Sequence, residues 1–174
     1  MLESKGITVY RIDDTTGQTD VSLNTRLQRA IAHNSDLHVS IHQNAVGDEW
    51  HPATGTETYY SVLGSEKSQS LAKQVAQKMA DYIGTNNRGD KGTTNELFIT
   101  REFTRAGIDA NLYEGLFMSN QQDVEQMKTE EYANSYAKAI AESILNTYRS
   151  EISNVPFTVR VKKDDYVISK TIVC

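Results

Sequence analysis

The chain has 174 residues, of which 38% are hydrophobic and 24% are charged, a composition typical of a soluble globular protein built around one substantial core. Its net charge of -5 gives no electrostatic sign of nucleic-acid binding, since such binders usually carry a basic face, and no nucleic-acid partner is expected. Cys174 is the only cysteine, so an internal disulfide and a thiolate metal cluster are excluded, and any metal site must use His, Asp or Glu. No segment has the length and apolarity of a signal peptide or a membrane span, so the chain as written is expected to be cytoplasmic when made.

The first elements in chain order are a strand, a loop, a helix and a second strand. Apolar residues alternate from Gly6 to Ile12 and predict a strand, which a polar loop follows from Asp13 to Asp20. Ser22 is the expected N-cap of a helix, and Leu37 to His42 form the next predicted strand. The helix between them is predicted from four apolar residues at helical spacing on one face: Leu23, Leu27, Ala30 and Ile31.

A strand and a longer helix are expected next. Gly55 to Ser61 reads as a strand, because Thr and Tyr pack well on a pleated surface. Glu66 to Ile83 reads as an amphipathic helix that Gly84 closes. Its apolar stripe consists of Leu71, Val75, Met79, Tyr82 and Ile83.

Two short apolar runs, Leu97–Thr100 and Ala110–Glu114, precede a helical region after Asn120. That region has an apolar residue at every fourth position: Tyr136, Ile140, Ile144 and Tyr148. Strands that alternate with helices indicate the α/β class, with a largely parallel sheet covered by helices on both faces.

The pattern changes after residue 150. Residues 151–156 are expected to be a linker, and Phe157-Thr158-Val159-Arg160-Val161 begins an alternating strand without a visible partner. Residues 1–150 are therefore interpreted as one domain and residues 157–174 as the start of a second module.

His42 and Glu114 are the candidate chemical residues, because each is predicted at the carboxyl end of a strand. Ligands of parallel α/β sheets bind at that edge, so the fold can bring the two side chains together. A neutral imidazole suits zinc, and a carboxylate beside an activated water can take its proton and pass it to a leaving amine. The residues alone leave an alternative open, in which His42 is a hydrogen-bonded strand-end histidine and Glu114 a solvated loop carboxylate.

Several motifs resemble one family, and they occur in its order. These are Gly6-Ile7-Thr8-Val9-Tyr10-Arg11, Asp36-Leu37-His38-Val39-Ser40-Ile41-His42-Gln43-Asn44-Ala45, Gly55-Thr56-Glu57-Thr58-Tyr59-Tyr60, Asn87-Arg88-Gly89 with Leu97-Phe98-Ile99-Thr100-Arg101, and Tyr113-Glu114-Gly115-Leu116-Phe117-Met118-Ser119-Asn120. Over roughly residues 2–148 the chain resembles the zinc-dependent N-acetylmuramoyl-L-alanine amidases of family 3, which serve as phage endolysins or bacterial autolysins.

The resemblance implies the family's amidase fold, of phosphorylase/hydrolase type, and assigns roles to residues. His42 would be a Zn²⁺ ligand and Glu114 the catalytic general acid/base. The family's other two ligands, a His after the first strand and a Glu at the start of the first helix, have no counterpart here and would precede Met1. The expectation is an N-terminally truncated copy that lacks its first strand and helix, and one histidine alone cannot supply a catalytic zinc site.

Other polar residues near the predicted site are assigned smaller roles. Glu57 and Asn44 are possible substrate contacts, although Glu57 is about as well explained as a strand carboxylate paired with Lys or Arg. His38 shares a strand face with His42 but lies four strand residues away, about 13 Å, too far to share a metal. His33 and His51 are interpreted as surface or hydrogen-bonded histidines.

The function implied by the resemblance is hydrolysis of the amide between N-acetylmuramic acid and the L-alanine of the peptidoglycan stem peptide, by a zinc-activated water at the bacterial cell wall. The module after residue 156 would then suit wall binding. Two other hypotheses remain: a non-catalytic remnant or wall-binding fragment of such an amidase, and an α/β metallohydrolase that acts on a different amide.

Overall fold

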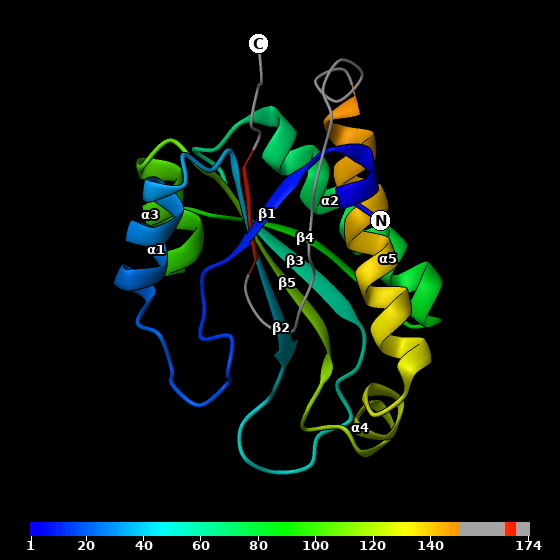
Figure 1. The fold of residues 1–174 in the computed structure, drawn as a ribbon. Coiled ribbons are helices and arrows are strands. Elements are labelled where there is room, and N and C mark those ends of the chain that lie inside the picture. The colour runs from blue at the N-terminus through cyan, green and yellow to red at the C-terminus, as the bar shows by residue number, and fades with distance from the viewer. Residues whose placement is uncertain (150–165, 170–174) are drawn as a thin grey trace.

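A computed structural model describes residues 1–149 and 166–169. One 3₁₀ turn, five helices and six strands make up this part of the chain (Figure 1). In chain order they are η1 (Glu3–Lys5), β1 (Thr8–Arg11), α1 (Leu23–Ala32), β2 (Leu37–Asn44), β3 (Thr56–Ser61), α2 (Glu66–Ile83), β4 (Asn87–Thr93), α3 (Phe98–Arg105), β5 (Asp109–Phe117), α4 (Gln121–Met127), α5 (Glu130–Thr147) and β6 (Tyr166–Ser169).

The six strands form one mixed sheet in the order β1-β6-β2-β5-β3-β4. The pairs β2/β5 and β3/β4 are parallel, whereas β1/β6, β6/β2 and β5/β3 are antiparallel. The predicted α/β class is confirmed, but the sheet is mixed and not largely parallel. The difference arises because β3 and β6 enter the sheet in the direction opposite to their neighbours β5 and β2, which the alternation of elements along the chain does not reveal.

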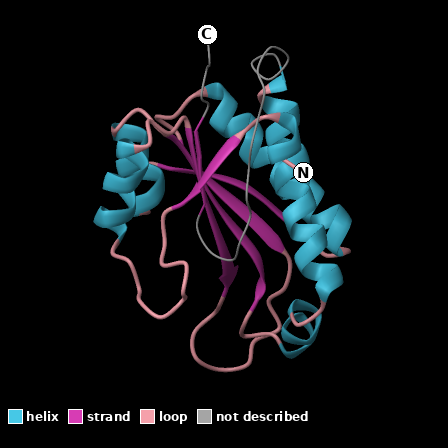
Figure 2. Ribbon diagram, in the orientation of Figure 1, coloured by secondary structure: helices cyan, strands magenta, loops and turns pink. Residues whose placement is uncertain are grey.

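Helices cover both faces of the sheet, as predicted (Figure 2). α2 and α5 pack on one face, over a core that includes Leu71, Val75, Tyr113 and Ile144. α1 and α3 lie on the other face (Figure 1), where the core is smaller and consists of Ile12, Ala30, Ile99, Phe103, Ile108 and Ala110. No described helix is long and apolar enough to span a bilayer.

The helix ends follow their sequence signals. The Ser22 side chain accepts a hydrogen bond from the backbone N–H of Thr25, which confirms the predicted N-cap of α1. α2 has the predicted bounds and ends at Gly84 with a left-handed φ of 75°. The apolar face predicted for α1 is only partly correct, because Leu23 and Ile31 are 41% and 43% exposed and Ala30 alone is fully buried.

Three segments differ from the sequence analysis. The apolar run Leu97–Thr100 begins helix α3, and strand β4 was not predicted because Asn87–Thr93 is polar and rich in glycine. The expected strand without a partner, 157–174, lies mostly outside the described residues. Its residues Tyr166–Ser169 form β6 and pair with both β1 and β2, so for these four residues the prediction is wrong. The division into two modules otherwise stays a prediction.

Candidate active site

Three polar side chains form a row across neighbouring strands of the sheet. His42 on β2 is the register partner of Glu114 on β5, and Glu114 is in turn the register partner of Glu57 on β3. Because register partners point to the same face of a sheet, the three side chains are immediate neighbours. By strand alternation this is also the face of His38, which stacks on Phe103 of α3 at 4.0 Å. The predicted meeting of His42 and Glu114 is present in the structure.

The backbone that carries the row is held from the opposite face by two tyrosines of α5. Tyr132 donates its hydroxyl hydrogen bond to Gln43 Oε1 at 2.6 Å, and the same oxygen accepts the backbone N–H of Leu116 at 3.0 Å. Tyr136 donates to the carbonyl oxygen of Tyr113 at 2.9 Å. Glycine is required at Gly115, because a Cβ there would overlap the Tyr132 hydroxyl. The residues next to His42 and Glu114 therefore join β2 and β5 to α5.

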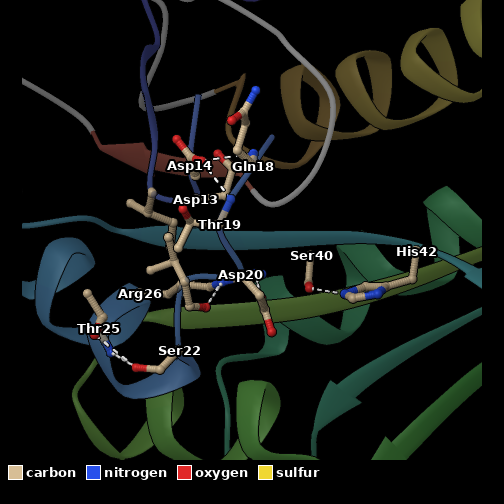
Figure 3. Close-up of polar contacts among 12 residues, drawn as sticks. Asp13, Asp14, Gln18, Thr19, Asp20, Ser22, Thr25, Arg26, Ser40 and His42 are labelled. Carbon is tan, nitrogen blue, oxygen red and sulfur yellow. Dashed lines mark hydrogen bonds and ion pairs between the residues drawn. The ribbon is translucent and has the colours of Figure 1, made fainter. Parts of the chain in front are cut away.

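The imidazole of His42 is exposed and lies against Ser40, whose Oγ is 2.6 Å from His42 Nε2 (Figure 3). This contact orients the ring, as a hydrogen-bond partner does for many histidines that bind metals. His42 lines a cavity of about 350 Å³ together with Ile41, Arg26 and part of the loop between β1 and α1; the loop residues are Asp13, Asp14, Gly17, Gln18, Thr19 and Asp20.

The carboxylates of that loop already have partners. Asp13 pairs with Arg11, and Asp20 pairs with Arg26 at 3.1 Å. Asp14 accepts hydrogen bonds from three backbone N–H groups and from the Thr16 hydroxyl. Residues 1–149 and 166–169 contain no group of three or more His, Cys, Asp or Glu side chains placed to hold a metal ion. By their geometry the described residues thus do not form a complete zinc site, and His42 is the single candidate ligand.

Glu114 is partly exposed and is part of strand β5, so it is not the solvated loop carboxylate of the alternative interpretation. Its Oε2 atom is buried and makes no hydrogen bond within the described part of the chain. Burial, and then the negative charge of Glu57, raises the pKa of Glu114 from 4.5 to about 7. A carboxyl group in this environment can both accept and donate a proton near neutral pH.

The Glu57 carboxylate is buried and is held by four donors. Asn44 Nδ2 and the Tyr59 hydroxyl bind Oε1 at 2.9 and 2.6 Å, and Arg88 Nε and Lys91 Nζ bind Oε2 at 2.8 and 2.5 Å. Burial raises the pKa of Glu57, but these hydrogen bonds outweigh it and lower the pKa to about 2. The structure thus shows the ion-paired alternative for Glu57, and the substrate contacts predicted for Glu57 and Asn44 stay predictions.

The other histidines are placed away from His42. His38 is fully buried and neither ring nitrogen has a hydrogen-bond partner among the described residues. His33 ends α1 and stacks on Tyr10 at 3.7 Å. His51 Nδ1 accepts the backbone N–H of Ala53 in the loop after β2. No sequence signal pointed to Ser40 as a site residue, and the only available signal for the two cations was the Asn87-Arg88-Gly89 motif, which contains Arg88 and precedes Lys91 by two residues.

Comparisons with known proteins agree on one family. The family model described as N-acetylmuramoyl-L-alanine amidase matches residues 1–146. The N-acetylmuramoyl-L-alanine amidase LytC of Bacillus subtilis is 32% identical over 135 residues, which are 77% of this chain but only 26% of that protein, so this chain spans about a quarter of its length. The crystal structure of an N-acetylmuramoyl-L-alanine amidase from Clostridium difficile 630 superposes with a TM-score of 0.66 at 27% identity, covering 79% of this chain and 70% of that one. The catalytic domain of CwlV, an N-acetylmuramoyl-L-alanine amidase from Bacillus (Paenibacillus) polymyxa, superposes with a TM-score of 0.64 at 27% identity. The match covers 75% of this chain and 68% of that one.

Proposed function

The chain belongs to the N-acetylmuramoyl-L-alanine amidase family, and from this premise we propose that it hydrolyses the amide between the lactyl group of N-acetylmuramic acid and the L-alanine of the peptidoglycan stem peptide. The substrate partner is then peptidoglycan, and the place of action is the bacterial cell wall. The observation that carries this proposal is the row of His42, Glu114 and Glu57, which aligns the two residues of the family resemblance at one edge of the sheet.

Glu114 is proposed as the catalytic acid and base. It accepts a proton from the attacking water, the oxygen of that water joins the lactyl carbonyl carbon, and the proton passes to the alanine nitrogen as the C–N bond breaks. The products are a carboxylic acid and a free amine, so one water is consumed and the protons balance. Glu114 is partly exposed, so its carboxyl group can meet the attacking water, and no hydrogen bond from the described residues to Oε2 has to be broken for this exchange.

Zinc enters the proposal only through His42, which would supply one of its ligands. Because the described residues do not complete a metal site, no step is assigned to the metal. Glu57 remains ion-paired with Arg88 and Lys91 beside Glu114 in this scheme, and no proton transfer is assigned to it.

The identity of the cleaved bond tests the proposal. The gene product that contains this chain is incubated with purified peptidoglycan, and newly exposed amino groups are labelled and identified after acid hydrolysis. We expect new amino-terminal L-alanine without an increase in reducing sugar ends. New reducing ends would indicate a glycosidase, and new amino termini of other residues would indicate a peptidase; either result would refute the assignment.

A further inference from the structure

Arg88 and Lys91 of strand β4 reach the same carboxylate oxygen, although residues three apart in a regular strand point to opposite faces. The reason is an extra residue in β4: Thr56 of β3 pairs with Asn87 and Thr58 pairs with Asp90, so two steps along β3 oppose three along β4. Gly89, between the two cations, has a left-handed φ of 89°. Irregularities of this kind turn side chains toward another face and are frequent beside active sites.

Beside Glu114 the two cations bind a single carboxylate, so one of their positive charges is uncompensated whenever Glu114 is protonated. Both bind Glu57 Oε2, so two positive charges share one negative charge. The Glu57 side chain is 5% exposed, whereas those of Arg88 and Lys91 are 38% and 40% exposed. Within the described part of the chain, the two Nη groups of Arg88 make no hydrogen bond, and only Nε is used.

Aromatic rings hold both cations in place from the side of the protein. The Arg88 guanidinium carbon lies 4.9 Å from the centre of the Phe117 ring, and Lys91 Nζ lies 5.4 Å from the centre of the Tyr59 ring. The Arg88 side chain also packs closely against Gly55, because a Cβ added at Gly55 would lie only 3.1 Å from Arg88 Cγ. A guanidinium fixed in this way loses little conformational entropy when it binds an anion.

The place of the cations indicates which part of the substrate they meet. His42 and the cations flank Glu114 on opposite sides, because β2 and β3 are the two neighbours of β5 and β4 follows β3. If Glu114 protonates the leaving alanine, the stem peptide extends from Glu114 away from His42, toward β4. Two strand spacings amount to about 10 Å, which an extended peptide covers in about three residues, and fewer when long Arg and Lys side chains reach toward it.

We propose that Arg88 and Lys91 form a subsite that binds a carboxylate of the stem peptide two or three residues beyond the scissile amide. This inference rests on the proposed amidase function and adds a substrate requirement to it. The subsite favours stem peptides that carry a free carboxylate at that position over peptides in which the same carboxyl group is amidated.

Isothermal titration calorimetry with two matched ligands tests the subsite. The ligands are N-acetylmuramoyl-L-alanyl-D-glutamate with its γ-carboxyl group amidated and its α-carboxylate free, and the same compound with the α-carboxyl group amidated as well. The titrations use the Glu114→Gln variant so that turnover is too slow to disturb the binding measurement. We expect the acid to bind about fivefold to tenfold more tightly than the amide, the range for a charge-assisted contact at a partly exposed site, with a preference that weakens as salt is added.

Three further variants separate recognition from folding. Arg88→Gln leaves Lys91 to compensate Glu57, so the fold should persist by circular dichroism while the preference for the acid falls to about one. Arg88→Lys should keep part of the preference, and Lys138→Gln, which removes an exposed cation of α5 paired with Glu142, should keep all of it.

The outcomes distinguish this inference from the proposed function. Equal binding of acid and amide would overturn the subsite while leaving the amidase intact, and so would a preference that survives Arg88→Gln. Binding of neither ligand would overturn both. Glycerol phosphate that displaces the acid at equal concentration would overturn the assignment to a peptide carboxylate, because it would indicate a general anion site.

Discussion

Replacing Gly115 by alanine tests whether the junction between β5 and α5 holds the site in place. A Cβ at this position would overlap the Tyr132 hydroxyl and would lie 2.5 Å from Gln43 Oε1 and 2.9 Å from Tyr136 Cε1. Overpacking of a well-packed site costs about 1–3 kcal/mol. Displacing Gln43 also weakens its bonds to Tyr132 and Leu116, about 1 kcal/mol each.

These terms sum to an expected decrease of about 3–5 kcal/mol in the free energy of unfolding for Gly115→Ala, which for a domain of this size lowers the melting temperature by about 6–20 °C. Thermal unfolding followed by circular dichroism measures it. Gly107→Ala is the matched control, because its φ is 81° and no atom lies within 4 Å of the added Cβ, so only the backbone penalty of about 1 kcal/mol applies.

The double variant Gly115→Ala, Tyr132→Phe removes the hydroxyl that the new methyl group would meet. It should be about 1 kcal/mol more stable than the sum of the two single changes predicts. Strict additivity, or a Gly115→Ala variant as stable as Gly107→Ala, would refute the argument that α5 fixes the backbone beside Glu114.

Two further predictions concern the histidines. Burial, then the positive charges of Arg26 and His42, lower the pKa of His38 from 6.5 to about 3, so the unfolded chain takes up a proton that the folded chain does not between those values. The contribution of this group is complete above about pH 6.5 and decreases by about 1.4 kcal/mol per pH unit below it. Urea unfolding at pH 7 and pH 5 measures how much the free energy of unfolding decreases between these pH values. The decrease should be smaller for His38→Phe than for the unaltered protein, and equal decreases would contradict the lowered pKa of His38. Metal analysis of this chain after dialysis should find well under one zinc per molecule, because His42 is the single candidate ligand in the described residues; tightly held stoichiometric zinc would show that ligands among His33, His38, His51 and the carboxylates were overlooked.

Local signals in the sequence predicted α1, α2 and the helical region of α4 and α5, but not α3. Period, cap and terminal glycine together located α2 with its observed bounds and Ser22 at the start of α1. The same signals could not show that α1 buries little beyond Ala30, because burial depends on the neighbours that the fold supplies. They also missed β4, an edge strand whose polar residues pair with β3 alone.

The site could be predicted only as far as strand ends are informative. His42 and Glu114 were expected to meet because both follow apolar strand residues, and the β2/β5 register places them side by side. An ion pair of Glu57 with Lys or Arg was expected as an alternative. The identity of its four donors could not be foreseen, because it depends on the antiparallel β5/β3 pairing and on the register shift beside Gly89. Strand order and register are set by long-range packing, which no local pattern encodes.

The most direct test of the proposed active site is the turnover of Glu114→Gln, measured as release of amino-terminal L-alanine from peptidoglycan by the gene product that contains this chain. The glutamine keeps the size of the side chain but cannot accept the proton. We predict that turnover falls by about 10² or more while the melting temperature stays within a few degrees, and that Glu125→Gln, a change at an exposed carboxylate of α4, leaves turnover unchanged. Turnover of Glu114→Gln equal to that of the unaltered protein would contradict the assignment of Glu114 as the acid and base.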